Sequence, residues 1–202
     1  MANQTRQSDL LPTMEQVEEE RRRIRYRAAY RRALFETVEV LLLVAAAAVL
    51  ISTLFLPVLQ ISGDSMEPTL SNNDIIVLVK TDRFQTGDLC SFSWNNRTLI
   101  KRVIGVSGDW IEIGADGTIY LNKEPLDEPY VTDKSLGECD LKFPYQVPEG
   151  ALFLVGDHRE TSIDSRSTVI GSVSREQVIG RVLFRVWPLS RFGSVNEHPA
   201  QG

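Results

Sequence analysis

Ser65 and Lys101 are the two residues of this chain whose types and surroundings best suit covalent chemistry. Ser65 lies in Gly63-Asp-Ser-Met-Glu-Pro68, four residues after the apolar Ile61, and Lys101 begins the segment Lys101-Arg-Val-Ile-Gly105. A serine hydroxyl is a weak nucleophile and becomes reactive when a neighbouring base takes its proton. The pair is therefore a candidate nucleophile with its base, although a serine beside glycine and proline is more often an ordinary turn residue.

Three side chains are candidates for that base. His198 lies in a polar C-terminal tail, and His158 is the better histidine, although its charged neighbours already explain a polar turn. An exposed lysine titrates at about 10.4, but burial among apolar residues lowers its pKa by several units. Strand alternation places Leu99, Lys101 and Val103 on one sheet face and the neighbouring arginine on the other. The residues alone leave this interpretation evenly balanced against a strand-edge lysine that discourages aggregation.

A membrane-length apolar run precedes Ser65. No charged residue occurs in the 22 residues from Val40 to Ile61, and a helix needs roughly 20 residues to cross a bilayer core of about 30 Å. A buried helix of a soluble protein would show a polar face, and a cleaved signal peptide would not follow so long a polar leader. We therefore expect a retained anchor, with residues 37–61 as a transmembrane helix.

Arginines before the apolar run indicate its orientation. Seven of them lie close together: Arg21, Arg22, Arg23, Arg25, Arg27, Arg31 and Arg32. Such charge holds the N-terminal side of a membrane helix in the cytoplasm, so we expect residues 1–36 to be cytoplasmic and residues 62–190 to be extracytoplasmic. Residues 1–36 hold 8 Arg and 6 acids (net +2), which leaves −7 for the rest of a chain whose total is −5. An acidic outer domain has no electrostatic footprint for nucleic acid, and we expect no such partner.

Beyond the apolar run the sequence changes to short β-type segments separated by turn signals. The expected strands are residues 74–80, 89–94, 99–106, 110–113, 152–155 and 178–187, with a hairpin turn at Asp116-Gly117. The stretch 122–149 carries four prolines and many charges, so we expect a long exposed loop there. Ser65 does not lie in a Gly-x-Ser-x-Gly elbow, which argues against an α/β-hydrolase. The expected fold is mainly β, with one N-terminal transmembrane helix, an all-β domain and a polar tail over residues 191–202.

The cysteines and histidines give little material for other chemistry. Cys90 and Cys139 are the two cysteines, and a single pair is weak evidence for a disulfide even where the compartment permits one. Two histidines without a Cys-x-x-Cys motif are a poor basis for a zinc site. We therefore expect neither a metal nor a cofactor.

Four segments, in order behind the apolar run, resemble the sequence boxes of type I signal peptidases. They are Ser65-Met-Glu-Pro-Thr-Leu70, Thr86-Gly87-Asp88, Lys101-Arg-Val-Ile-Gly105, and Gly156-Asp157 leading to Ser162-x-Asp164-Ser165-Arg166. The resemblance covers roughly residues 40–188. It implies a membrane-bound serine–lysine endopeptidase on a β fold, which removes signal peptides from exported preproteins after Ala-x-Ala-like sites. The implied location is the cell membrane (inner or plasma, or an internal photosynthetic one).

Carried onto this sequence, the resemblance implies a role for each matching residue. Ser65 would be the nucleophile, with its backbone N–H in the oxyanion hole, and Lys101 the general base. Ser162 would hydrogen-bond and orient the lysine amine, while Asp164 and Arg166 would form an ion pair that holds the shape of the site. The other implied positions are Gly156 and Asp157 in support, and Gly63, Asp64, Met66 and Pro68 in the oxyanion and substrate-binding region.

Gly63 is a departure from the commonest pattern of that family. Some members place a serine there, whose hydroxyl gives a second oxyanion donor, so the source of that donor stays open. Ser107 and His158 also replace a frequent proline and a frequent asparagine, which we interpret as local variation.

Three other functions compete with this interpretation. A self-cleaving SOS-type repressor shares the serine–lysine pair but is soluble and carries a DNA-binding domain. A catalytically silent, membrane-anchored β module would bind partners without turnover. A Ser-His-Asp hydrolase would need His158 as its base. The expected partners are preprotein signal peptides and the lipid bilayer, and the oligomeric state is left open.

Overall fold

The computed structural model of the chain describes residues 13–195, with the backbone alone for residues 51–55. The chain divides into two compact units, residues 1–51 and 52–202, and each is described by itself. One long helix accounts for the described part of the first unit, and the strands of the second form two β-sheets joined by long loops. The predicted fold class, mainly β with one N-terminal apolar helix, is confirmed.

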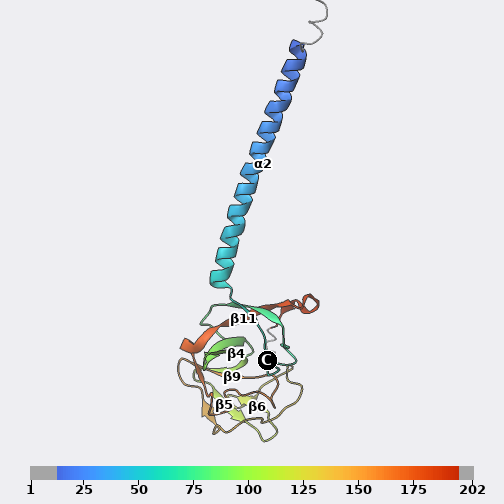
Figure 1. The fold of residues 1–202 in the computed structure, drawn as a ribbon. Helices are drawn as coiled ribbons and strands as arrows, with labels where there is room; N and C mark the ends of the chain where they lie inside the picture. Colours follow the sequence, from blue (N-terminus) through green and yellow to red (C-terminus); the bar gives the residue numbers. More distant parts are fainter. Residues whose placement is uncertain (1–12, 196–202) are drawn as a thin grey trace, which may run out of the picture. The chain divides into compact units, whose positions relative to one another are not determined.

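Helix α2, Met14–Phe55, is continuous through the arginine-rich segment and the apolar run (Figure 1). Its first turn is closed by a capping box, in which Gln16 N donates to Thr13 Oγ1 (3.4 Å) and Thr13 N donates to Gln16 Oε1 (3.0 Å). Arginine, glutamate, alanine and leucine are strong helix formers and fill most of it. Its length and composition suffice to cross a membrane.

The C-terminal end of the predicted helix is wrong by six residues. The helix ends at Phe55, and Val58–Gln60 forms strand β1 instead. Pro57 explains the difference, because proline lacks the N–H that a helix requires and disfavours helical backbone at the residue before it. Ile61, expected at the end of the span, is only 8% exposed and packs in the core of the β unit.

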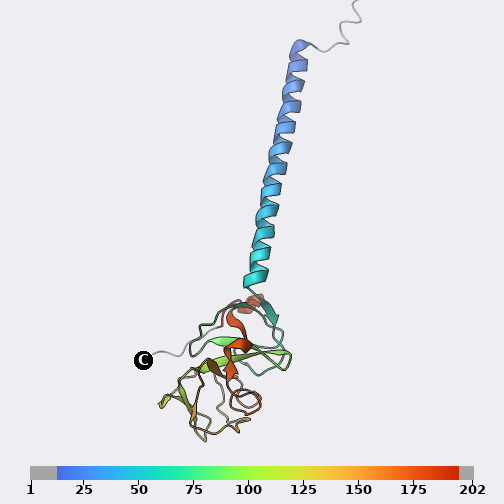
Figure 2. The same ribbon diagram turned by 90° about the vertical axis from the view of Figure 1, so that its left-hand side faces the viewer.

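The β unit contains two sheets. The large sheet has eight strands in the order β1-β2-β11-β3-β4-β9-β10, with β12 paired to β11, and the small sheet has the order β7-β6-β5-β8. Figures 1 and 2 both show the small sheet at one end of the unit, beyond β4 and β9. The remaining strands are β2 Ile75–Val79, β3 Leu89–Trp94, β4 Arg97–Val106, β5 Trp110–Ile113, β6 Ile119–Leu121, β7 Glu124–Pro125, β8 Tyr145–Gln146, β9 Ala151–Val155, β10 Val173–Ser174, β11 Val178–Trp187 and β12 Gly193–Ser194. Two short 3₁₀ helices, Arg175–Gln177 and Leu189–Arg191, flank β11.

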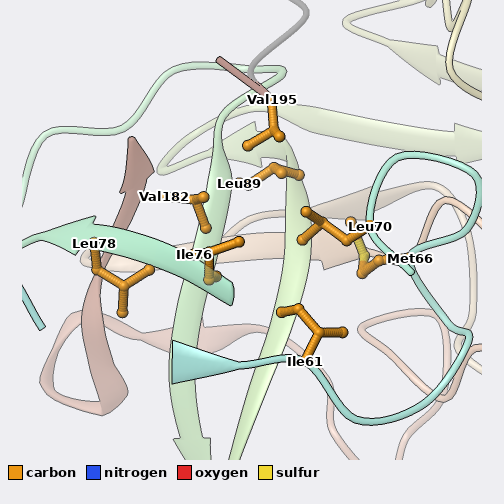
Figure 3. Close-up of a cluster of buried hydrophobic side chains, with 8 residues drawn as sticks. All are labelled: Ile61, Met66, Leu70, Ile76, Leu78, Leu89, Val182 and Val195. Atoms are coloured by element: carbon orange, nitrogen blue, oxygen red, sulfur yellow. The ribbon is translucent and has the colours of Figure 1, made fainter. Parts of the chain in front are cut away.

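One hydrophobic cluster anchors the segment that carries Ser65. It joins side chains of β2, β3 and β11 to residues before and after that serine, as Figure 3 shows: Ile61, Met66, Leu70, Ile76, Leu78, Leu89, Val182 and Val195. Met66 and Leu70 are 3% and 0% exposed, and burying each such side chain contributes about 1.5–3 kcal/mol. The turn around Ser65 is therefore fixed by the core on both of its sides.

The strand predictions were largely confirmed, since 89–94, 110–113 and 178–187 match residue for residue. Two other predictions were partly wrong. The loop 122–149 contains β7 and β8, and it buries Glu128 and Tyr130. The polar tail does not begin at 191, because β12 pairs with β11 and Val195 is 5% exposed. Residues 196–202, including His198, lie outside the described residues. Cys90 and Cys139 are both free thiols.

Candidate active site

Ser65 lies in a tight turn between β1 and β2. Glu67 N donates to the Asp64 carbonyl (2.9 Å) and Leu70 N donates to the Met66 carbonyl (2.8 Å), which closes the turn on itself. At its start Gly63 has a φ of +105°, a conformation that favours glycine. Its N–H donates to the side chain of Asn72 (3.2 Å). Ser65 is half-buried, and hydrogen bonds fix the backbone on both sides of it.

Lys101 meets Ser65 from the middle of β4. Its Nζ donates to Ser65 Oγ across 2.7 Å, although 36 residues separate the two in the sequence. The lysine is 3% exposed, and burial lowers its pKa from 10.5 to about 8, against a smaller opposing effect of the Asp164 charge. An amine of this pKa is neutral in a useful fraction of molecules near neutral pH, and a neutral amine can accept a proton.

Asp164 is the centre of a second group of hydrogen-bonded residues in the site. Its Oδ2 accepts hydrogen bonds from Ser162 Oγ (2.6 Å), Gly156 N (2.9 Å) and Arg166 Nη2 (2.9 Å), and its Oδ1 accepts one from Arg166 Nε (2.8 Å). The expected Asp164–Arg166 ion pair is therefore present, with both side chains at most 1% exposed. Its role in holding the site stays a prediction.

Ser162 differs from the expectation in its partner. Its hydroxyl donates to Asp164, and the hydrogen bonds of residues 13–195 include none between Ser162 and Lys101. The carboxylate explains this choice, because a charged acceptor makes the stronger hydrogen bond. Ser162 still borders the site, since a Cβ added at Gly156 would lie 2.6 Å from both Ser162 Cβ and the Ser65 carbonyl oxygen.

Sequence reasoning missed that Arg102 belongs to the same assembly. Its guanidinium binds Asp157 with two hydrogen bonds, Nε–Oδ1 at 2.8 Å and Nη2–Oδ2 at 2.6 Å, and both side chains are fully buried. Thr69, from the turn of Ser65, donates its hydroxyl to the same carboxylate. Arg102 also donates to the carbonyl of Gly87, within the Thr86-Gly87-Asp88 box (2.8 Å). The position of Arg102 beside Lys101, on the opposite sheet face, was the available signal.

His158 contributes through its backbone rather than its ring. Its N–H donates to the Ser65 carbonyl (3.2 Å), while ring Nδ1 lies 2.5 Å from the Thr161 hydroxyl. The side chain that hydrogen-bonds Ser65 Oγ is Lys101 and not this ring. The geometry therefore favours the lysine over the histidine as base.

A cavity of about 100 Å³ borders Ser65 and is lined by Leu59, Gln60, Ile61, Ser62, Gly63, Met66, Thr98, Leu99 and Ile100. One wall is β1 with the chain that follows it, and the other is the beginning of β4. In that part of β4, residues 97–101 pair with β3 on one edge, whereas pairing with β9 begins only at Arg102. The second edge of this stretch thus has no strand partner in the part of the chain that the structure describes. Asp64 and Pro68, also expected near the substrate, lie in the same turn as Ser65 and are exposed.

Comparison with known proteins decides the family. The family described as signal peptidase, peptidase S26, matches residues 34–187. The chain belongs to the signal peptidase family. Signal peptidase IB of Staphylococcus aureus is 36% identical over 152 residues, which cover 65% of this chain and 78% of that protein. Signal peptidase I of Bacillus licheniformis is 30% identical over 171 residues, covering 78% and 91%.

A solved signal peptidase I from Enterococcus faecalis is also similar, with 30% identity and a TM-score of 0.41 over 49% of this chain and 96% of that one. The predicted membership of the type I signal peptidases, enzymes that remove signal peptides, is confirmed by the family match and the curated relatives. Membership of the signal peptidase family disfavours the SOS-type repressor. A signal peptidase is a peptide-bond hydrolase, so the silent binding module is disfavoured as well.

Proposed function

We propose that this signal peptidase cleaves preproteins with Ser65 as the nucleophile and Lys101 as the general base. The observation that carries the proposal is the 2.7 Å contact between Lys101 Nζ and Ser65 Oγ, made by a lysine whose pKa is lowered by burial to about 8. A nucleophile within hydrogen-bond reach of a base is the geometry that acyl transfer requires.

The reaction runs through a covalent intermediate. Neutral Lys101 takes the proton of Ser65 as Oγ attacks the scissile carbonyl, and the resulting ammonium then returns the proton to the leaving amine. A water molecule, deprotonated by the same lysine, then attacks the acyl carbonyl, and the lysine returns that proton to Ser65 Oγ as the ester bond breaks and the acyl group leaves. The Ser65 N–H stabilises the oxyanion, and a donor of this kind is worth about 3 kcal/mol. Asp164 and Arg166 take no proton, and hold the backbone beside the nucleophile.

The unpaired edge of β4 supports an extended substrate. A peptide placed between residues 97–101 and the chain after β1 can pair its backbone with a free strand edge, while alternate side chains enter the groove. Leu59, Ile61, Met66, Leu99 and Ile100 make that groove partly apolar and small. Such a groove suits small residues of the Ala-x-Ala type before the cut.

The anchor gives the enzyme its place in the membrane. We propose that the apolar part of α2 spans the bilayer, with residues 1–36 in the cytoplasm and the β unit on the extracytoplasmic side. The catalytic domain of this arrangement begins at β1, four residues earlier than the sequence boundary of 62 indicates. A preprotein whose signal peptide is still in the bilayer then presents its cleavage segment to a membrane-held enzyme.

Preprotein cleavage by reconstituted full-length protein tests the proposal. Wild type is expected to cut a preprotein before the mature sequence, while Ser65→Ala and Lys101→Met lose the activity and the exposed-lysine control Lys80→Met keeps it. Full activity in Lys101→Met would remove the lysine from the mechanism. A loss in His158→Ala as large as that in Ser65→Ala would favour the histidine as base.

A further inference from the structure

Two side chains of the segment between β7 and β8 are buried, although the sequence predicts an exposed loop there. Glu128 is 7% and Tyr130 is 3% exposed, whereas their neighbours Asp127 and Pro129 are exposed. A glutamate is almost never buried unless it is paired. The contacts of these two residues show where this loop is attached.

Glu128 pairs with Arg159, which in turn holds Gly156. Both nitrogens Nη1 and Nη2 of Arg159 donate to the Glu128 carboxylate, and the two side chains are 1% exposed. Arg159 Nε donates to the Gly156 carbonyl (3.1 Å). Because the ion pair fixes the guanidinium, it also fixes the position of that carbonyl.

Tyr130 covers the second arginine of the site. Its ring centroid lies 3.7 Å from Cζ of Arg102, which is cation–π distance, and its hydroxyl donates to Glu128 Oε1 (3.3 Å). Arg102 holds the carboxylate of Asp157 with two hydrogen bonds. The two loop residues thus contact each other and one arginine each.

Both connections converge on the segment Gly156-Asp157-His158, which touches the nucleophile. His158 N donates to the Ser65 carbonyl, and Gly156 lies so close to that oxygen that an added Cβ would be 2.6 Å from it. We propose that Glu128 and Tyr130 are positioning residues, which set the place of Ser65 relative to Lys101 through Arg159 and Arg102. This inference rests on the proposed serine–lysine mechanism and adds to it a loop that contacts neither catalytic side chain.

Steady-state cleavage by full-length variants in detergent tests the inference. Glu128→Gln and Tyr130→Leu are expected to lower kcat on the order of 10- to 100-fold with little change in KM, because a small displacement of a nucleophile costs rate while the substrate groove stays intact. Tyr130→Phe keeps the ring over Arg102 and is expected to retain most of kcat. Asp127→Asn is the matched control, since it removes an exposed charge beside Glu128, and is expected to behave as wild type.

Folding is checked separately by near-UV circular dichroism, with kcat measured well below the melting temperature. If Glu128→Gln does not fold, Glu128→Gln/Arg159→Gln removes both buried charges, and we expect it to fold and still have a low kcat. Folded variants with wild-type kcat would overturn the inference, as would Tyr130→Phe being as slow as Tyr130→Leu. Wild type that does not cleave, or active Lys101→Met, would instead overturn the serine–lysine mechanism on which the inference rests.

Discussion

Lys101 and Arg166 are both buried cations of the β unit, yet their surroundings are opposite. Arg166 binds Asp164 through Nε and Nη2 and also donates to the carbonyls of Ser135, Leu136 and Arg159. Lys101 takes part in none of the ion pairs found within residues 13–195, and its Nζ contacts the Ser65 hydroxyl. A fully paired arginine stays charged and fixes its neighbours. A buried amine without a carboxylate contact gives up its proton easily, which a general base requires.

The largest effect is expected when the lysine is given the properties of the arginine. Lys101→Arg keeps a cation beside Ser65 that cannot be deprotonated, so we expect cleavage to fall about 10³–10⁴-fold, the upper range for a general base. Single-turnover cleavage of a preprotein measures it, with Lys80→Arg as the exposed control. Activity within a few fold of wild type would show that no proton passes through this position.

The converse change removes the carboxylate partner of the paired arginine. Asp164→Asn leaves Arg166 charged, buried and without its carboxylate, so we expect a loss of about 3–5 kcal/mol in the free energy of unfolding. Urea denaturation of the β unit followed by tryptophan fluorescence measures it. Asp82→Asn, at an exposed carboxylate, is the control. If Asp164→Asn lost no more unfolding free energy than Asp82→Asn, the Asp164–Arg166 ion pair would not stabilise the fold.

Lys101→Met is expected to change stability in the other direction. The folded pKa of about 8 lies below the unfolded value of 10.5. Below the folded pKa the wild-type protein carries the full cost of a buried charge, and its stability rises with pH between the two values. At neutral pH, Met in this place should therefore stabilise the protein by about 1–3 kcal/mol. Thermal unfolding at two pH values tests this, and the variant should lose the pH-dependent rise.

The smallest expected effect is the dependence of the cleavage rate on pH. In the proposed mechanism the neutral amine of Lys101 is the active form, so kcat/KM should fall about tenfold for each pH unit below its pKa and level off above it. The plateau is then expected above about pH 8. The control variant Asp127→Asn changes an exposed carboxylate and should show the same pH profile as wild type. A limb centred on about 6.5 would point to a histidine instead.

Sequence patterns predicted the strands well because alternation and turn residues act locally. The hairpin at Asp116-Gly117 is one case, with Gly117 at a φ of +82° and Ile113 paired with Ile119. The end of the helix was missed although Pro57 is a local signal for it, because the uncharged run continues past Pro57 to Ile61. The pairing of Val58–Gln60 with β2 shows that this part of the run is a strand.

The candidate site was predicted from short segments that match a family, and the partners of those segments were not. Glu128 and Arg159 are 31 residues apart, and nothing near Glu128 distinguishes it from a solvated loop acid. Ser162 was expected at the lysine amine, and a stronger acceptor two residues away takes its hydroxyl. Contacts of this kind depend on three-dimensional proximity that composition and spacing do not encode.

The half-paired stretch of β4 also bears on when a protein can be processed. A backbone can join a strand edge only while its own N–H and C=O groups are unoccupied, and residues inside a folded helix or sheet have already used theirs. A cavity of about 100 Å³ lies beside residues 98–100 of this edge. In the proposed mechanism, the residues around the cut therefore have to reach Ser65 before they join a folded domain, so that processing competes with folding of the substrate.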